Sequence, residues 1–201
     1  MQTATITTPP APGPYRFTVD EYLRMAELGL LHPDVRTELV DGQVIVMSPK
    51  NQPHIWTKNA IHEELYDALG RHPRWQVIDQ DAIVVSEANA PEPDLAVVPR
   101  RPRADVLWRA AEAQLIVEVS DTTLADDLGR KRLLYAGAGV PNYWVADVNL
   151  RQVHRFAEPR DGDYAVHEVL DTDDRIRVPG APDDRATVSV GAFFPTRPAS
   201  R

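Results

Sequence analysis

The segment Leu115–Ser120 constrains the fold more than any other part of this chain. Its sequence, Leu-Ile-Val-Glu-Val-Ser, is short, apolar and rich in β-branched residues. Such a run is typical of a central strand that is covered on both faces of a sheet. Because side chains alternate along a strand, Glu118 shares one face with Ile116 and Ser120, opposite the other three apolar residues. The run therefore predicts a sheet with a layer packed against each face.

Glu118 is the one acid within this apolar strand, and a buried carboxylate is costly unless it pairs with a base or binds a metal. An ion pair with an Arg or Lys is one interpretation. Asp94 makes a metal site the other, because it follows Pro93 where another strand is expected to begin. Two carboxylates from the ends of adjacent strands form a hard oxygen site for Mg²⁺ or Mn²⁺, and the backbone carbonyl of Val119 can add a ligand.

Lys131 belongs to a helix that is expected over Leu124–Ala138, directly after the acidic strand. Leu128 and Tyr135 lie on the same apolar stripe as Lys131, so the stripe points the lysine toward the sheet. Two interpretations stay open from this spacing. Lys131 either forms an i,i+4 ion pair with Asp127 or is held close to the two acids of the sheet.

The rest of the chain alternates between helical and strand patterns. Thr18 and Glu21 form a T-x-x-E capping box, which predicts the start of a first helix. Asp41-Gly42 predicts a hairpin turn between two short strands over Arg36–Met47. The remaining segments are a helix over Pro53–Leu69 and strands over Gln76–Ser86, Asp94–Val98, Asn142–Val148, Arg151–Phe156, Tyr164–Leu170, Arg175–Val178 and Ala186–Val190. This order predicts an α/β fold, a mixed β-sheet flanked by helices, with extra antiparallel strands near the C-terminus.

Length and composition limit the domain organisation and the compartment. The chain has 201 residues, no cysteine and a formal net charge of −8. We expect one domain over residues 15–195, a disordered tail over residues 1–14 and a loose tail over residues 196–201. The absence of cysteine, of a secretory signal and of a long apolar run predicts a cytoplasmic protein without membrane spans. The acidic balance argues against a protein that coats nucleic acid non-specifically.

Several pieces of the sequence, taken in order, resemble the Uma family of restriction-endonuclease-like proteins. That family is grouped with the PD-(D/E)XK nuclease superfamily, and the resemblance spans about residues 17–194. The pieces that carry the resemblance are Arg36-Thr37-Glu38-Leu39-Val40-Asp41-Gly42, Pro93-Asp94-Leu95, Leu115–Ser120, Asp127-Leu128-Gly129-Arg130-Lys131 with Tyr135, and Gly139–Asp147. The ordered set is specific, whereas each piece alone is not. The resemblance implies a restriction-endonuclease-like fold.

The resemblance also assigns roles to the acids and the lysine. Asp94 matches the aspartate of the motif and Glu118 matches its second acid. The lysine of the motif normally lies two residues after that acid on the same strand, where this chain has Ser120. The chain therefore resembles those nucleases in which the lysine has moved to the next helix, at Lys131.

Two further residues match positions of the family. Glu38 matches an additional early acid that many such sites use, and His54 matches a histidine at the start of the second helix. His54 also falls on the apolar stripe of that helix, with Ile61 and Leu65. Its alternatives are therefore a core histidine and a hydrogen bond to one of the acids.

The resemblance implies a Mg²⁺-dependent endonuclease that hydrolyses DNA, with Mn²⁺ as a possible substitute and a homodimer as the expected assembly. The alternative is a catalytically inactive interaction module that has kept the nuclease fold. Divalent-metal affinity discriminates between the two, because an inactive scaffold has no reason to hold Mg²⁺ between Asp94 and Glu118.

Overall fold

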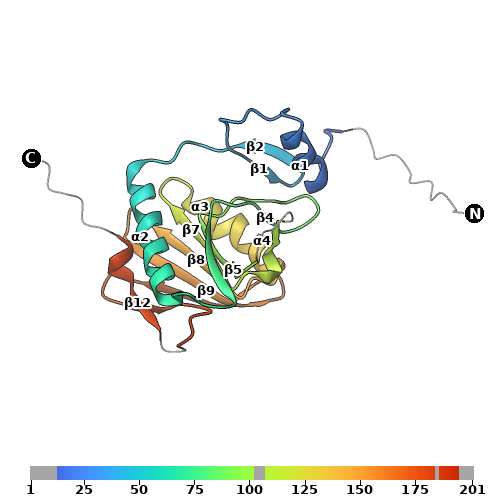
Figure 1. Cartoon of the computed structure of the whole chain (residues 1–201). Coiled ribbons are helices and arrows are strands. Elements are labelled where there is room, and N and C mark those ends of the chain that lie inside the picture. Colours follow the sequence, from blue (N-terminus) through green and yellow to red (C-terminus); the bar gives the residue numbers. More distant parts are fainter. Residues whose placement is uncertain (1–12, 102–106, 184–185, 195–201) are drawn as a thin grey trace, which may run out of the picture.

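A six-stranded mixed sheet forms the centre of the computed structural model, which describes residues 13–101, 107–183 and 186–194 (Figure 1). The predicted tails lie outside these residues, except for positions 13 and 14. In spatial order the strands are β10 (Asp163–Leu170), β9 (Gln152–Arg160), β8 (Asn142–Asp147), β7 (Leu115–Ser120), β5 (Leu95–Pro99) and β3 (Trp75–Asp79). Within this sheet β7 and β8 pair in parallel, whereas every other neighbouring pair is antiparallel. The predicted mixed sheet is thus confirmed, with the acidic strand β7 inside it.

Helices cover both faces of this sheet. Helix α2 (Gln52–Leu69) packs Ile61 and Leu65 against the β7 face that carries Val117. The opposite face carries Ile116 and packs against Tyr135 in a helical segment formed by α3 (Leu124–Asp126), η2 (Asp127–Lys131) and α4 (Arg132–Gly137). Figure 1 shows α2 and α4 on opposite sides of the strands. The alternation along β7 therefore sorts its side chains between two cores, as its sequence predicts.

A smaller unit at the N-terminal end has a core of its own. It consists of α1 (Val19–Glu27), β1 (Thr37–Val40) and β2 (Gln43–Val46), and its buried cluster includes Tyr22 and Leu39. The predicted capping box is present, because the Glu21 amide donates to Thr18 Oγ1 and the Thr18 amide donates to a Glu21 carboxylate oxygen. Figure 1 shows this unit above one end of the main sheet. This unit therefore lies beside the ends of the central strands.

The turn between β1 and β2 gives a first prediction about stability. Asp41 and Gly42 both have positive φ, 47° and 72°, as a two-residue hairpin of this kind requires. A Cβ on Gly42 would lie 2.8 Å from the Cβ of Arg16. We expect Gly42→Ala to destabilise the fold by more than ~1 kcal/mol, through backbone strain and this contact together. Chemical denaturation measures the loss.

Gly162 supplies the matched control for this substitution. It has φ 82°, yet a Cβ there would meet no atom within 4 Å. Gly162→Ala therefore carries the backbone strain without the steric contact, and we expect it to cost less than Gly42→Ala. Equal losses for the two variants would contradict a role for the contact with Arg16.

The segment Gln76–Ser86 was predicted as one strand, and this prediction is wrong. Strand β3 ends at Asp79, because Gln80 adopts φ 56° and turns the chain out of the sheet. The following β4 (Ile83–Val84) pairs in parallel with β6 (Trp108–Arg109), outside the main sheet. The sequence of residues 76–86 thus has the composition of a strand on both sides of the turn, and it does not reveal that the strand ends at Asp79.

The C-terminal part contains the predicted extra strands. Strands β11 (Arg175–Arg177) and β12 (Thr187–Ser189) form an antiparallel pair, while β9 and β10 extend the main sheet. Two short 3-10 helices, η1 (Ala110–Glu112) and η3 (Val190–Phe193), complete the elements. Within the described ranges, no helix has both the length and the apolar character needed to cross a bilayer.

Candidate active site

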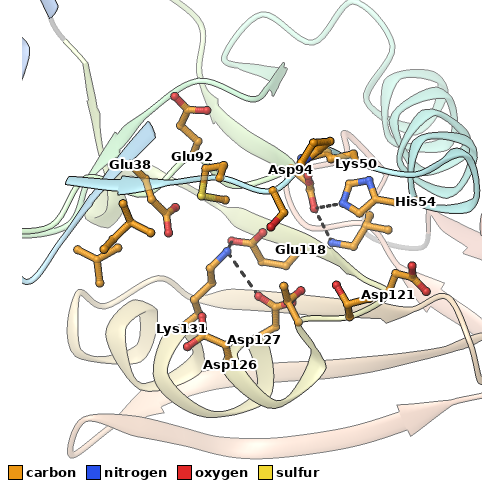
Figure 2. A pocket seen from close by; sticks show the side chains of 18 of the residues that line it. Glu38, Lys50, His54, Glu92, Asp94, Glu118, Asp121, Asp126, Asp127 and Lys131 are labelled. Atoms are coloured by element: carbon orange, nitrogen blue, oxygen red, sulfur yellow. Dashed lines mark hydrogen bonds and ion pairs between the residues drawn. The ribbon is translucent and has the colours of Figure 1, made fainter. Parts of the chain in front are cut away.

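A cavity of about 410 Å³ opens between the N-terminal unit and the ends of β5 and β7. All the residues singled out from the sequence line it: Glu38, His54, Asp94, Glu118, Val119 and Lys131. They come from β1, α2, the start of β5, β7 and η2. Figure 2 shows the side chains of Glu38, His54, Asp94 and Lys131 around Glu118, with Glu118 between Asp94 and Lys131. The fold therefore brings together residues that are up to 93 positions apart in the sequence, from 38 to 131.

Asp94 is held by three donors immediately before β5. Its Oδ2 accepts the Val119 amide hydrogen at 2.8 Å and faces His54 Nε2 at 3.1 Å, while its Oδ1 faces the ammonium group of Lys50. Burial alone would raise the pKa of Asp94. The hydrogen bond from His54 and the charge of Lys50 oppose burial and hold that pKa well below its ordinary value. Asp94 is therefore an ionised carboxylate across the neutral pH range.

Glu118 is the buried acid in the middle of the cavity wall. Its Oε1 lies 2.9 Å from Lys131 Nζ and accepts a hydrogen bond from the Tyr135 hydroxyl at 3.0 Å. Burial raises the pKa of Glu118 to about 8, although the charge of Lys131 works against this rise. The negative charges of Asp127 and Asp94 contribute to the same rise. A proton or another cation close to Glu118 is thus strongly favoured.

Lys131 bridges two acids. Its Nζ lies 2.9 Å from Glu118 and 3.4 Å from Asp127 Oδ1, so both ion pairs considered from the sequence are present at once. Burial alone would lower the pKa of Lys131, but the charges of Glu118 and Asp127 raise it above its ordinary value. Lys131 is therefore a permanently charged ammonium group inside the cavity.

The helix that carries Lys131 is not purely α-helical. Residues Asp127–Lys131 form a π-helical turn, the type of irregularity that often occurs at functional sites. The hydroxyl of Tyr143, on β8, donates to the carbonyl oxygen of Asp127 at 3.0 Å. In a regular α-helix this carbonyl oxygen would accept a hydrogen bond from within the helix. Here it accepts one from a strand of the sheet, so the turn has a hydrogen-bond partner outside the helix.

Glu38 and His54 complete the predicted set. Glu38 is 4% exposed on β1, and its Oε2 has no hydrogen-bond partner within the described part of the chain. His54 follows the N-cap residue Asn51 on α2 and contacts Asp94 through Nε2. Of its two sequence-based alternatives, the hydrogen bond to an acid is confirmed. Glu38 leaves a carboxylate oxygen free to bind water or a cation.

Ser120 stands where the motif lysine of related nucleases lies, and it does not line the cavity. Its hydroxyl is fully buried and lies 3.3 Å from Thr123 Oγ1. Among the described residues, the ammonium groups of the cavity come from Lys131 and Lys50 instead.

Sequence reasoning missed Lys50 and several charged residues of the wall. These residues are Glu92, Asp121 and Asp126, whereas Asp127 and Arg130 were named from the sequence but not placed in the wall. One signal for Lys50 was present in the composition. The chain has three lysines, Lys50, Lys58 and Lys131, among 22 lysines and arginines, so the other 19 are arginine. Two of these three lysines line one cavity.

Comparison with known proteins assigns the family. The model of the Uma2 family, described as "Putative restriction endonuclease", matches residues 19–189. The chain belongs to the Uma2 family. This match covers the N-terminal unit, the six-stranded sheet and every residue of the site described above. The predicted resemblance is thus confirmed.

One solved structure supports the fold of this Uma2 protein. A crystal structure described as "a putative nuclease belonging to DUF820", from Anabaena variabilis ATCC 29413, aligns with a TM-score of 0.69 and 17% identity, over 89% of this chain and 97% of that one. The type IIG restriction endonuclease BpuSI aligns with a TM-score of 0.39 and 15% identity, over 75% of this chain and 17% of that one. No curated protein matches the chain. The first alignment confirms the nuclease-type mixed sheet.

Folds of the restriction-endonuclease type commonly use divalent metals, so the cavity of this Uma2 protein was tested for its fit to one. Seven acids line it, against Lys50, Arg130, Lys131 and one histidine. The described side chains contain no group of three or more acids and histidines arranged to hold an ion. Mg²⁺ does not need such a group, because it keeps several waters and binds through one or two carboxylates. The ionised Asp94, the adjacent Glu118 and the unpaired oxygen of Glu38 fit that requirement.

Proposed function

We propose that this protein is a divalent-metal-dependent endonuclease that hydrolyses phosphodiester bonds in DNA. One observation carries the proposal: Asp94, Glu118 and Lys131 meet in a single acidic cavity although they come from three separate elements. Membership of the Uma2 family supports the same chemistry.

The acids and the histidine supply a cation site. Asp94 and Glu118, with the backbone carbonyl of Val119, are the groups that would hold Mg²⁺ or Mn²⁺. Such an ion, when bound, polarises a phosphate and lowers the pKa of a coordinated water. His54 fixes the orientation of the Asp94 carboxylate through their hydrogen bond. Glu38 carries an unpaired buried oxygen, which is suited to accept a hydrogen bond from water in the cavity.

Lys131 supplies positive charge beside these acids. Its ammonium group is fixed by Glu118 and Asp127, so it needs no rearrangement to stabilise negative charge that develops on phosphate oxygens. This is the role that the strand lysine has in related nucleases. Because a symmetric pair of centres can cut both strands of a duplex in one encounter, we also propose that the protein acts as a homodimer.

The test of the proposal is cleavage of supercoiled plasmid with Mg²⁺ or Mn²⁺. We expect conversion to nicked and linear DNA that stops when EDTA removes the metal. Linear product formed without a nicked intermediate supports the dimer, and sedimentation measures the assembly directly. Absence of cleavage on plasmid, single-stranded DNA and RNA, together with no Mn²⁺ binding by calorimetry, would overturn the proposal in favour of a non-catalytic interaction module.

A further inference from the structure

The two oxygens of Asp94 have different kinds of partner. Oδ2 is hydrogen-bonded by groups from two regular elements, the Val119 amide of β7 and the His54 ring of α2. Oδ1 faces Lys50 and has no other hydrogen-bond partner among the residues that the structure describes. Oδ1 is therefore the Asp94 oxygen that remains for a bound cation, and it is also the oxygen that the Lys50 ammonium group contacts.

Lys50 is attached to the fold differently from the other residues of the cavity. It lies in the linker between β2 and α2, outside any helix or strand, directly before the N-cap residue Asn51. Asp94 is the one polar partner recorded for its side chain in the described ranges. A lysine has a flexible four-carbon stem, so its ammonium group can leave this place without moving the sheet or the helix.

The other two lysines are held in ways that do not permit this. Lys131 contacts two acids from within η2, and Lys58 contacts both oxygens of Asp79, at 2.9 and 2.6 Å, from within α2. Lys131 therefore stays in the cavity, and Lys58 lies outside it. Among the three, Lys50 alone combines a single acid partner with a place in a linker.

We propose that Lys50 is a built-in counter-cation that occupies the metal-facing oxygen of Asp94 and must swing out when a divalent metal binds. This inference rests on the proposed metal-dependent function and adds a regulation of the same site. An ammonium group and a divalent ion repel each other at hydrogen-bond distance, so the two exclude one another at Oδ1. Lys50 thereby neutralises the ionised, buried Asp94 in the metal-free protein and weakens its affinity for metal.

Calorimetric titration with Mn²⁺ tests the inference on the full chain. We expect Lys50→Met to bind Mn²⁺ at least tenfold more tightly than the wild type. Lys50→Gln, which keeps a hydrogen-bond donor but no charge, is expected to bind more tightly as well. Lys58→Met is the matched control, because it removes a lysine from another Lys–Asp pair, and its Mn²⁺ affinity is expected to equal that of the wild type.

The outcomes separate the inference from the proposed function. Unchanged or weaker Mn²⁺ binding by both Lys50 variants, with measurable binding by the wild type, overturns the counter-cation role and leaves the metal site standing. Failure of the wild type and both Lys50 variants to bind Mn²⁺ overturns the metal-dependent function and this inference together.

Acetylation of lysine side chains, followed by mass spectrometry, gives a readout without any substitution. The chain has three lysines, so each one can be followed separately. We expect saturating Mn²⁺ to increase the acetylation rate of Lys50 severalfold, because its ammonium group moves into solvent, while Lys58 keeps its rate as the internal reference. A Lys50 rate that Mn²⁺ leaves unchanged or lowers contradicts the displacement.

Discussion

DNA cleavage by the Lys131→Met variant is expected to fall by ~10²–10³-fold, which is the usual cost of removing one preorganised group that stabilises transition-state charge. The same variant is expected to lose ~3–5 kcal/mol of folding stability, since the substitution leaves the buried acids Glu118 and Asp127 without their shared ion partner. The two atoms of that pair lie 2.9 Å apart, and both side chains are almost fully buried. Plasmid cleavage and chemical denaturation measure the two effects separately.

A double variant tests the source of the stability loss. Lys131→Met is combined with Glu118→Gln, because glutamine removes the charge, keeps the length of the side chain and keeps an oxygen for the Tyr135 hydroxyl. We expect Lys131→Met/Glu118→Gln to recover part of the lost stability, because position 118 then carries no charge and only Asp127 stays buried without its lysine. Cleavage is expected to stay low. Recovery of both stability and cleavage would show that neither Lys131 nor Glu118 has a catalytic role.

The Asp94→Asn variant is expected to lose cleavage by about 10³-fold or more, because an amide cannot replace the ionised oxygen of a cation site worth several kcal/mol. Asparagine has the same shape and keeps an oxygen for the Val119 amide, so β5 and β7 remain joined. The Mn²⁺ affinity measured by calorimetry is expected to fall together with cleavage.

Asp79→Asn is the control for this second prediction. Asp79 also pairs with a lysine, Lys58, but it does not line the cavity. Its substitution removes one negative charge and one Lys–Asp pair without touching the proposed site, so cleavage is expected to stay at the wild-type level. An Asp94→Asn protein that cleaves like the wild type would remove Asp94 from the catalytic site.

Local rules predicted the central part of the site because its residues follow regular periods. Alternation along Leu115–Ser120 placed Glu118 opposite Val117, and helical spacing pointed Lys131 toward the sheet. The turn Asp127–Lys131 is π-helical, yet Lys131 still contacts Glu118 of the sheet and Asp127 of its own helix. The Asp41-Gly42 hairpin was predicted because its turn needs two residues that tolerate positive φ.

Residues without a period escaped prediction. Lys50 lies in a linker, where no spacing indicates the direction of a side chain, and its partner Asp94 is 44 residues away. Gln80 ends β3 through a positive φ that glutamine seldom adopts, so the sequence resembled one uninterrupted strand. In both cases the conformation depends on contacts between distant segments, which no local pattern records.

The parallel pairing of β7 with β8 has a consequence for the order of folding. The crossover that joins these strands contains Lys131, so Glu118 and its lysine are separated by thirteen residues, from 118 to 131, within one contiguous β-α-β unit. Asp94 and Lys50 must instead close a loop of 44 residues. Closing the longer loop costs more chain entropy. We therefore expect the Glu118–Lys131 half of the site to assemble early, and the Asp94 half to form last during refolding.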